Sequence, residues 1–174
     1  MSGFEQRLTG GHPNSLGNTV EVVEEVLANH QKFDELFNCY FSNDEVVRLR
    51  VSNAMKRICK EEKQLLLPYI NRFLTEISVI NQASTQWTLS QLFDMLKKDM
   101  NPEQITKATA IMKSNLANHQ DWIVLNTTMQ TLSNWAKKDE ALRAFVLPHL
   151  KRLSSDERKS VAGRARKLLL LLEK

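Results

Sequence analysis

Residues 44 to 77, DEVVRLRVSNAMKRICKEEKQLLLPYINRFLTEI, indicate how this 174-residue chain folds. Apolar side chains recur in this stretch at the intervals i, i+4, i+7, i+8 and i+11, once from Val47 to Ile58 and again from Leu66 to Ile77. An α-helix turns once every 3.6 residues, so this spacing places one apolar stripe on each of two helices. The stretch therefore predicts a pair of amphipathic helices that become stable only by packing.

The same spacing continues on both sides of this stretch, and no sustained period-two alternation occurs. We therefore predict an all-α fold with short loops, which makes sequential helices antiparallel. The expected helices are 19–30, 32–41, 44–59, 64–78, 85–98, 102–117, 122–137, 140–153 and 155–172. Residues 1–17 contain four glycines and a proline and are expected to be an irregular N-terminal leader, whereas residues 18–174 are expected to form one domain.

Four helix starts carry a capping signature, in which Asn or Ser is followed three residues later by Glu or Gln. These residues are Asn18, Ser42, Asn101 and Ser154. Asn101 also precedes Pro102, and proline suits the first helical position because its missing N–H has no partner there. We expect each of these side chains to cap the helix that follows.

The sequence also contains an internal echo. Residues 66–73, LLPYINRF, are similar to residues 146–153, VLPHLKRL, and the two prolines are 148 − 68 = 80 residues apart. Another helix pair is expected between them, so the repeating unit is about forty residues long. Two-helix repeats of the HEAT type have this period.

On these residues the chain resembles the HEAT/armadillo superfamily of α-helical repeats, most clearly in the acidic start, the Val-Arg and the Leu-Pro of residues 44–77. The resemblance covers roughly residues 19 to 172, although the middle pair lacks the Leu-Pro. It implies an α-α superhelix, a HEAT-like solenoid of about four antiparallel helix pairs plus a C-terminal helix. A plain helical bundle is the alternative, because short loops and amphipathic helices fit it too.

The charge of the chain is unevenly distributed. Nine basic and three acidic residues lie between Arg143 and Lys174, whereas the rest of the chain has fifteen basic and seventeen acidic residues. Such asymmetry can mark a site for an acidic partner, and it is equally typical of a solvated outer helix.

No catalytic motif is present. The chain has no Gly-rich phosphate loop and no His-Glu-x-x-His pair, and Cys39 and Cys59 lack metal-ligand spacing. We therefore expect no enzyme activity, cofactor, metal or small-molecule substrate, and we expect two buried thiols. The N-terminus lacks the pattern of a secretory signal, and the apolar run Leu168–Leu172 is too short to span a bilayer, so a cytoplasmic location without membrane association is expected.

The tryptophans divide into two groups. We expect Trp135 to be buried with its indole N–H bonded to an acceptor. Trp87 and Trp122 lie near expected helix starts, where they staple neighbouring pairs or anchor a partner. A HEAT-like DNA glycosylase would use an aromatic and acidic surface, for which Trp135 and Asp139 are the candidates, but the motif of that family does not match residue by residue.

The resemblance implies that the second helix of each pair lines a concave recognition face. The polar residues expected there are Tyr69, Arg72, Glu76, Thr106, Lys113, His149 and Arg152. We predict a non-catalytic adaptor or scaffold that binds another protein on this strip. The alternative is a nucleic-acid-binding protein that uses a basic C-terminal patch of Arg158, Lys159, Arg164, Arg166 and Lys167. Salt distinguishes the two, since phosphate contacts weaken steeply with ionic strength.

Overall fold

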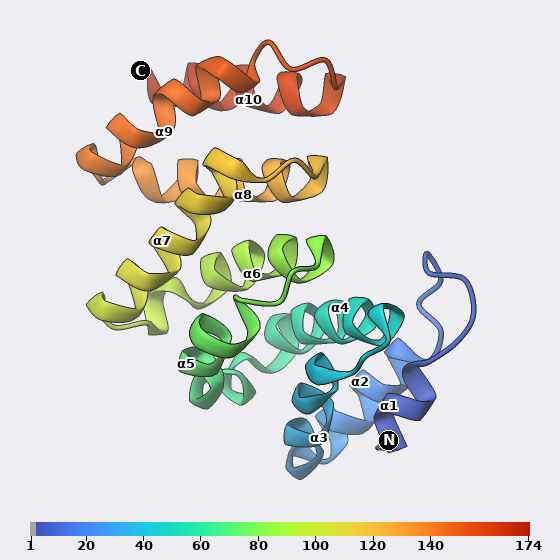
Figure 1. Ribbon diagram of the computed structural model, residues 1–174. Coiled ribbons are helices and arrows are strands. Elements are labelled where there is room, and N and C mark those ends of the chain that lie inside the picture. Colours follow the sequence, from blue (N-terminus) through green and yellow to red (C-terminus); the bar gives the residue numbers. More distant parts are fainter. Residues whose placement is uncertain (1–2) are drawn as a thin grey trace.

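The computed structural model describes residues 3–174, and all regular structure in this range is helical (Figure 1). The α-helices are α1 (Gly3–Leu8), α2 (Thr19–Ala28), α3 (Phe33–Asn38), α4 (Glu45–Glu62), α5 (Ile70–Arg72), α6 (Ala83–Leu96), α7 (Pro102–Asn118), α8 (Trp122–Ala136), α9 (Glu140–Leu153) and α10 (Lys159–Leu172). Short 3₁₀ segments are formed by His30–Lys32, Cys39–Phe41, Lys63–Leu65, Leu67–Tyr69 and Lys97–Asp99, and a π-helical segment by Phe73–Ile77. The predicted all-α class is confirmed.

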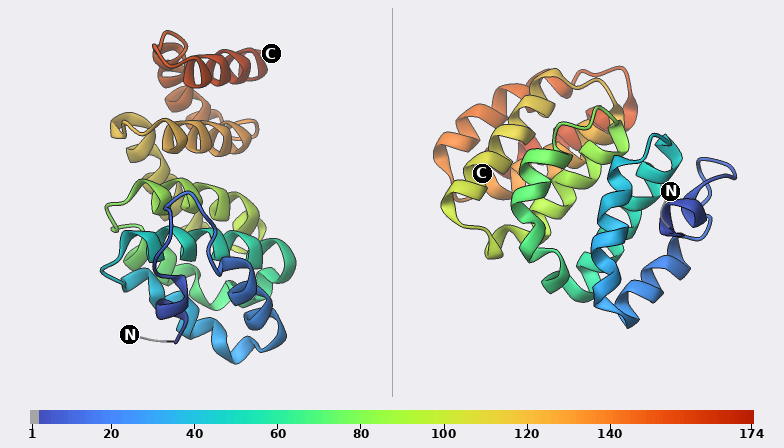
Figure 2. Two further views of the ribbon diagram at one scale, coloured as in Figure 1. Left: turned by 90° about the vertical axis from the view of Figure 1, so that its right-hand side faces the viewer. Right: turned by 60° about the horizontal axis from the view of Figure 1, so that its bottom comes forward.

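The helices from α2 onwards form two layers. In the first layer α2 packs on α4, α4 on α6, α6 on α8 and α8 on α10. The helices α3, α5, α7 and α9 form the second layer. The stack is bent, with the first layer on the inner side of the bend and the second layer on the outer side (Figures 1 and 2). We call them the inner layer (α2, α4, α6, α8, α10) and the outer layer (α3, α5, α7, α9).

Small side chains explain why the inner layer is the more closely packed one. The buried polar residues of α6 and α8 are mostly serines and threonines, such as Ser90, Thr131 and Ser133. The Thr131 hydroxyl donates a hydrogen bond to the Ser90 carbonyl oxygen at 3.0 Å, directly between the two helices. Side chains of this size let neighbouring helices approach closely. The inner row of helices is therefore shorter than the outer row, and the stack bends.

The hydrophobic core lies between the layers and contains both predicted stripes of residues 44–77. Val47, Val51 and Ile58 of α4 are fully buried, and so are Phe73 and Ile77 of the segment that follows it. Both cysteines are buried as well, and burial raises the pKa of the Cys59 thiol to about 11. The predicted core of the deciding stretch is confirmed.

The range 64–78, predicted as one helix, is wrong in its local structure. It is divided into two 3₁₀ turns, the single turn of α5 and the π-helical segment. Pro68 lies in the second 3₁₀ turn, and the α-helical turn begins only after it, at Ile70. Pro148, its counterpart in the echo, lies inside the continuous helix α9. The two similar sequences therefore do not form the same local structure.

Residues 1–17 were predicted to be an irregular leader, but part of this range is helical. Residues 3–8 form α1, whose Phe4 and Leu8 are buried one turn apart. The helix packs against α3 and α4, and the backbone N–H of Phe4 donates to Glu35 Oε1 at 3.0 Å. Two apolar residues were too short a pattern to recognise as a helix. Residues 9–18 are irregular, and we call them the N-terminal loop; residues 1 and 2 of the predicted leader lie outside the described range.

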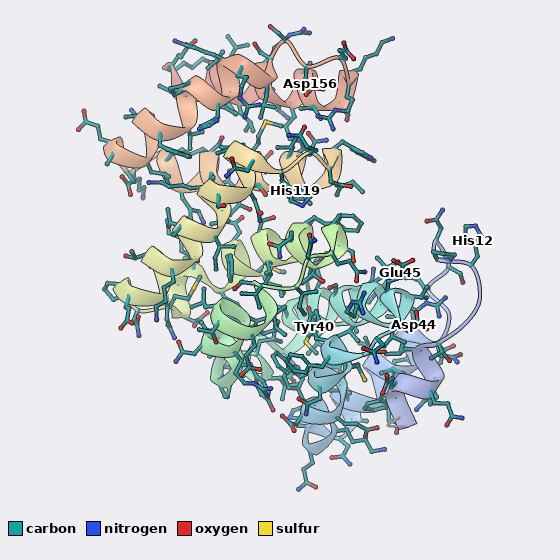
Figure 3. All side chains as sticks on the ribbon, in the orientation of Figure 1. His12, Tyr40, Asp44, Glu45, His119 and Asp156 are labelled. Carbon is teal, nitrogen blue, oxygen red and sulfur yellow. The ribbon has the colours of Figure 1, made fainter. Side chains whose placement is uncertain are left out.

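A buried arginine holds the N-terminal loop in place. Arg50 of α4 is 2% exposed and donates hydrogen bonds to the carbonyl oxygens of Leu8, His12 and Ser15, at 2.8, 3.3 and 3.2 Å. Gly17 has a φ of +51°, and a Cβ at this position would lie 2.9 Å from the Arg50 guanidinium. Only glycine fits this turn. The loop, with His12 at its outer end, projects on the inner side of the molecule (Figure 3).

The four capping predictions have different outcomes. Asn101 forms the predicted capping box with Gln104, whereas Asn18 makes no cap and instead donates to the Arg7 carbonyl oxygen. Asp44 rather than Ser42 caps α4. Ser154 ends α9 instead of starting the next helix, and α10 begins at Lys159 rather than at 155. The remaining boundaries differ from the prediction by a few residues.

Candidate functional site

The predicted partner-binding strip lies on the outer side of the bend, not on a concave face. Tyr69 ends the 3₁₀ turn before α5, Arg72 ends α5, and Glu76 lies in the π-helical segment that follows it. Thr106 and Lys113 belong to α7, and His149 and Arg152 belong to α9. The prediction assumed that second helices line the concavity. The close packing of the first helices reverses this arrangement, as Figure 1 shows.

Arg72 is fully engaged within the protein. Its guanidinium contacts the Glu76 carboxylate at 2.9 and 3.1 Å and the Asp34 carboxylate at 3.7 Å, and it lies 4.5 Å from the centroid of the Phe37 ring. The Tyr69 hydroxyl donates to Asp34 Oδ1 at 2.9 Å. Hydrogen bonds to Glu76 raise the pKa of Arg72, and burial followed by the Asp34 bond raises the pKa of Tyr69. These contacts attach α3 to the segment around α5.

The other members of the strip also make contacts within the protein. Lys113 Nζ lies 4.8 Å from the centroid of the Phe145 ring, and Arg152 Nη2 donates to the Leu116 carbonyl oxygen at 3.1 Å, so both connect α7 to α9. Burial, followed by the charge of Arg152, lowers the pKa of His149. Thr106 donates to the Pro102 carbonyl oxygen of its own helix. The strip therefore consists mainly of side chains that connect elements.

The inner side has two adjoining hollows. The first, of about 330 Å³, lies among α4, α6, α8 and α10 and includes Lys56, Lys60, Gln91 and Asp94. The second, of about 340 Å³, lies between α8 and α10 and includes Trp122, Gly163 and Lys167. Asn126, Gln130 and Arg164 line both hollows, so the two are continuous. We call them together the inner groove.

Four basic side chains line the inner groove without an acidic partner. Lys56 and Lys60 come from α4, and Arg164 and Lys167 come from α10, more than a hundred residues later in the sequence. Among the described residues, none of the four forms an ion pair with a carboxylate. Arg164 donates only to the uncharged Gln130 Oε1, at 3.0 Å. The groove therefore concentrates uncompensated positive charge.

The pKa of Lys56 reflects this concentration. Burial lowers it first, and the positive charges of Lys60 and Arg57 lower it further. The one carboxylate lining the groove belongs to Asp94, which accepts hydrogen bonds from Trp135 Nε1 at 2.9 Å and from Asn134 at 3.3 Å. Asp94 is thus oriented by two donors of α8 rather than by the lysines. A bound anion would relieve the repulsion among the cations.

The tryptophans are placed differently from one another. Trp135 is 4% exposed and donates to Asp94, as predicted for a core residue. Asp139, its suggested partner in a glycosylase site, caps α9 by accepting from the Leu142 N–H at 2.9 Å. That pair therefore forms no accessible aromatic and acidic surface. Trp122, by contrast, is 49% exposed at the inner groove, and Trp87 is partly exposed beside the N-terminal loop.

The predicted basic C-terminal patch is divided by the structure. Arg164 and Lys167 line the inner groove, one helical turn apart. Arg158 binds the Asp156 carboxylate at 2.8 and 2.9 Å, and Arg166 donates to the Ser154 carbonyl oxygen at 3.1 Å. Lys159 is exposed and does not line the groove. Only two of the five residues therefore share a site.

Sequence reasoning missed Lys56, Lys60, Gln91 and Asn126. One local signal was available, because Lys56 and Lys60 form an i, i+4 pair of like charge. Such a pair destabilises a helix, so its presence on a packed helix indicates a function for the charge. The two amides carried no signal, because only packing reveals that they are buried beside the cations.

A different hollow, of about 510 Å³, opens beside α7. It is lined by the turn from Ser78 to Asn81, by Gln86, and by one face of α7 from Ala110 to His119. None of its lining residues is Asp, Glu, Lys or Arg, and Val79 is 76% exposed at its edge. We call it the outer hollow, and its uncharged lining contrasts with the inner groove.

Within residues 3–174 no three His, Cys, Asp or Glu side chains are grouped so that they could hold a metal ion. In the same range no helix combines the length and the apolar character that crossing a bilayer requires. The chain matches no protein-family model, and the comparison with curated proteins finds no match.

Proposed function

We propose that this protein binds nucleic acid through the inner groove, and that its helix pairs form a HEAT-like solenoid whose inner layer is the recognition surface. The observation that carries the proposal is the convergence of Lys56, Lys60, Arg164 and Lys167 on one groove without a carboxylate partner. Phosphates are the ligands that neutralise such an array, and the release of condensed counterions makes their binding favourable.

The state of the basic residues elsewhere supports the inner groove rather than the predicted strip. Arg72 and Arg158 have carboxylate partners, and Arg152 donates to a backbone carbonyl oxygen. Engaged side chains of this kind contribute to the fold and are not free to bind phosphate. The groove cations Lys56 and Lys60, in contrast, repel one another: burial is the first cause of the lowered pKa of Lys56, and the charge of Lys60 lowers it further.

Fluorescence anisotropy with labelled DNA and RNA oligonucleotides, titrated between about 50 and 200 mM salt, tests the proposal. The variant Lys56→Gln, Lys60→Gln, Arg164→Gln, Lys167→Gln should bind at least tenfold more weakly. Its plot of log K against log salt should be less steep by about 3, because four phosphate contacts are lost.

The matched control carries the same change of net charge away from the groove, at Lys107, Lys137, Lys138 and Lys151, which are all exposed. Substitution of these four by Gln should leave both the affinity and the salt slope nearly unchanged. The proposal is overturned if the unaltered protein binds no oligonucleotide at 50 mM salt, or if both variants lose affinity equally.

A second candidate is the adaptor function predicted from the sequence, and the outer hollow favours it. An uncharged hollow with the exposed Val79 at its edge suits an apolar peptide segment. Capture from the native source with and without nuclease tests this function. A protein partner that survives nuclease treatment and is lost from the Val79→Arg variant would support it, whereas recovery of nucleic acid alone would exclude it.

A further inference from the structure

We propose that the inner groove contains a site for one unpaired nucleobase that carries an amino group, formed by Gln91, Asn126 and Trp122. This inference rests on the proposed function and adds the kind of nucleic acid that the groove selects. It is carried by two amide oxygens that have no donor among the described residues and by an exposed indole in the adjoining hollow, which Asn126 also lines.

Asn126 has a buried side-chain oxygen that lacks a hydrogen-bond donor among the described residues. Its side chain is on α8, 7% of the residue is exposed, and it lines both hollows of the inner groove. Its amide nitrogen donates to Ser160 Oγ at 3.3 Å, but no donor among the described residues reaches its Oδ1. Buried acceptors in folded proteins nearly always have a donor, so this oxygen indicates a ligand that supplies one.

Gln91 repeats the same feature on α6. Its Oε1 is also buried without a donor in the described part of the chain, and the residue lines the same hollow as Asn126. Two neighbouring helices therefore each carry a buried, unsatisfied acceptor on a residue that lines the same hollow. A phosphate cannot satisfy them, because its oxygens are acceptors too.

The inner groove therefore contains two kinds of polar group, cations and unsatisfied amide oxygens. Its cations suit phosphate, whereas its amide oxygens need N–H donors. A nucleotide has both parts, since its phosphate is anionic and the amino groups of cytosine, adenine and guanine are donors. Thymine and uracil have a carbonyl oxygen where cytosine has its amino group and offer a single imino N–H, whereas an amino group offers two N–H donors, one for each amide oxygen. We therefore expect amino-bearing bases to be preferred.

Trp122 explains why the base must be unpaired. It is exposed in the hollow that Asn126 also lines, facing the part of α10 that contains Gly163. A Cβ built at Gly163 has no atom within 4 Å, so the hollow is open at this point of α10. Aromatic side chains stack on bases whose faces are free, whereas the bases of a duplex are stacked on each other.

The test compares labelled 20-mers of deoxycytidine and deoxyuridine, whose bases differ only in the groups that pair. The unaltered protein should bind the deoxycytidine strand at least about fivefold more tightly, the lower limit for one well-made base contact. It should bind a duplex of the same length more weakly than the deoxycytidine strand.

Three variants locate the effect. Asn126→Ala and Gln91→Ala should each reduce the difference between the two strands without changing the salt slope. Ser160→Ala is the control, since it removes the partner of the Asn126 nitrogen but leaves the Oδ1 in place. Trp122→Ala should weaken binding of both single strands at least about fivefold, and Trp122→Phe should restore most of the affinity. Circular dichroism verifies that each variant is folded.

The outcomes separate the two proposals. Salt-dependent binding with equal affinity for both strands and for duplex overturns the base site and leaves the proposed function intact. A preference for deoxycytidine that persists in both amide variants also overturns it. Absence of any binding overturns the proposed function itself. If the protein prefers deoxycytidine, a competition experiment with free deoxycytidine monophosphate follows. Displacement of the strand by the free nucleotide assigns the site to nucleotides in solution, whereas no displacement assigns the site to a strand.

Discussion

The inner and outer layers both carry basic side chains, but these differ in what they contact. In the outer layer Arg72 has two carboxylates and an aromatic ring as partners. In the inner layer Lys56 and Arg164 line a groove with no carboxylate partner among the described residues. Residue type alone therefore does not identify a binding surface. The two surfaces are distinguished by whether each basic side chain has a carboxylate partner.

The largest expected effect concerns the two arginines that hold segments in place, Arg50 on the inner side and Arg72 on the outer side. Arg50→Met should lower the free energy of unfolding by about 3 kcal/mol, because several hydrogen bonds to a buried charged group are lost. Arg72→Met should cost about 1 kcal/mol or less, because its ion pairs are partly exposed. Urea denaturation measures both values.

Limited proteolysis supplies an independent readout for the same pair. The N-terminal loop should become sensitive to cleavage in Arg50→Met but not in Arg72→Met. Equal losses of stability in the two variants, or a loop that stays protected without Arg50, would contradict the assigned role of this arginine.

The second prediction concerns the packing that distinguishes the layers. Ser90 is 1% exposed between α6 and α8, whereas Ala110 of α7 is exposed. Ser90→Leu should cost about 1–3 kcal/mol, because a larger side chain must be forced between two closely packed helices. Ala110→Leu should change stability by less than about 0.5 kcal/mol. Thermal unfolding followed by calorimetry compares them, and similar melting temperatures would refute close packing as the cause of the bend.

The smallest expected effect is a change in the pKa of Asp156, and it distinguishes Arg158, which has a carboxylate partner, from Arg164, which has none among the described residues. Hydrogen bonds from the Arg158 side chain, and then from its backbone N–H, lower the pKa of Asp156 to about 2. This interaction stabilises the folded state above about pH 4, the ordinary range of the carboxyl pKa, and the stabilisation is lost as the pH falls through about 2. In Arg158→Met the pKa of Asp156 should rise toward 3.8, as carboxyl carbon shifts in an NMR titration can show.

Arg164→Met is the control for that titration. Arg164 has no carboxylate partner among the described residues and donates to Gln130, so its loss should leave the pKa of Asp156 unchanged. A pKa of Asp156 that stayed near 2 without Arg158 would show that the backbone hydrogen bond alone is sufficient.

Most of the helices could be predicted because the information for them is local. The spacing of apolar residues in α4 and the capping box at Asn101 depend on neighbours within one or two turns. The failures have causes beyond that range. Pro68 interrupts its helix and Pro148 does not, although the residues around them are similar. Phe4 and Leu8 form a helix only because α3 and α4 are there to cover them.

The candidate site was predictable only in part. Arg164 and Lys167 belonged to the predicted basic patch, but Arg158 and Arg166 were equally plausible from their positions in the sequence. The structure separates them, because Arg158 binds the Asp156 carboxylate two residues away and Arg166 donates to the Ser154 carbonyl oxygen at the end of α9. Asn126 and Gln91 looked like ordinary polar positions until packing buried their oxygens beside the cations.

Local patterns specify the helical class and the buried stripes and place most helices to within a few residues, because these features depend on side chains that are close along the chain. Which layer lies on the inner side of the bend, and hence which charges meet in one groove, depends on the packing of helices that are distant along the chain. The bend arises from small side chains between α6 and α8, and the groove contains Lys56, Lys60, Arg164 and Lys167, none of which has a carboxylate partner among the described residues. The first feature depends on contacts between residues about forty positions apart, and the second on residues about a hundred positions apart.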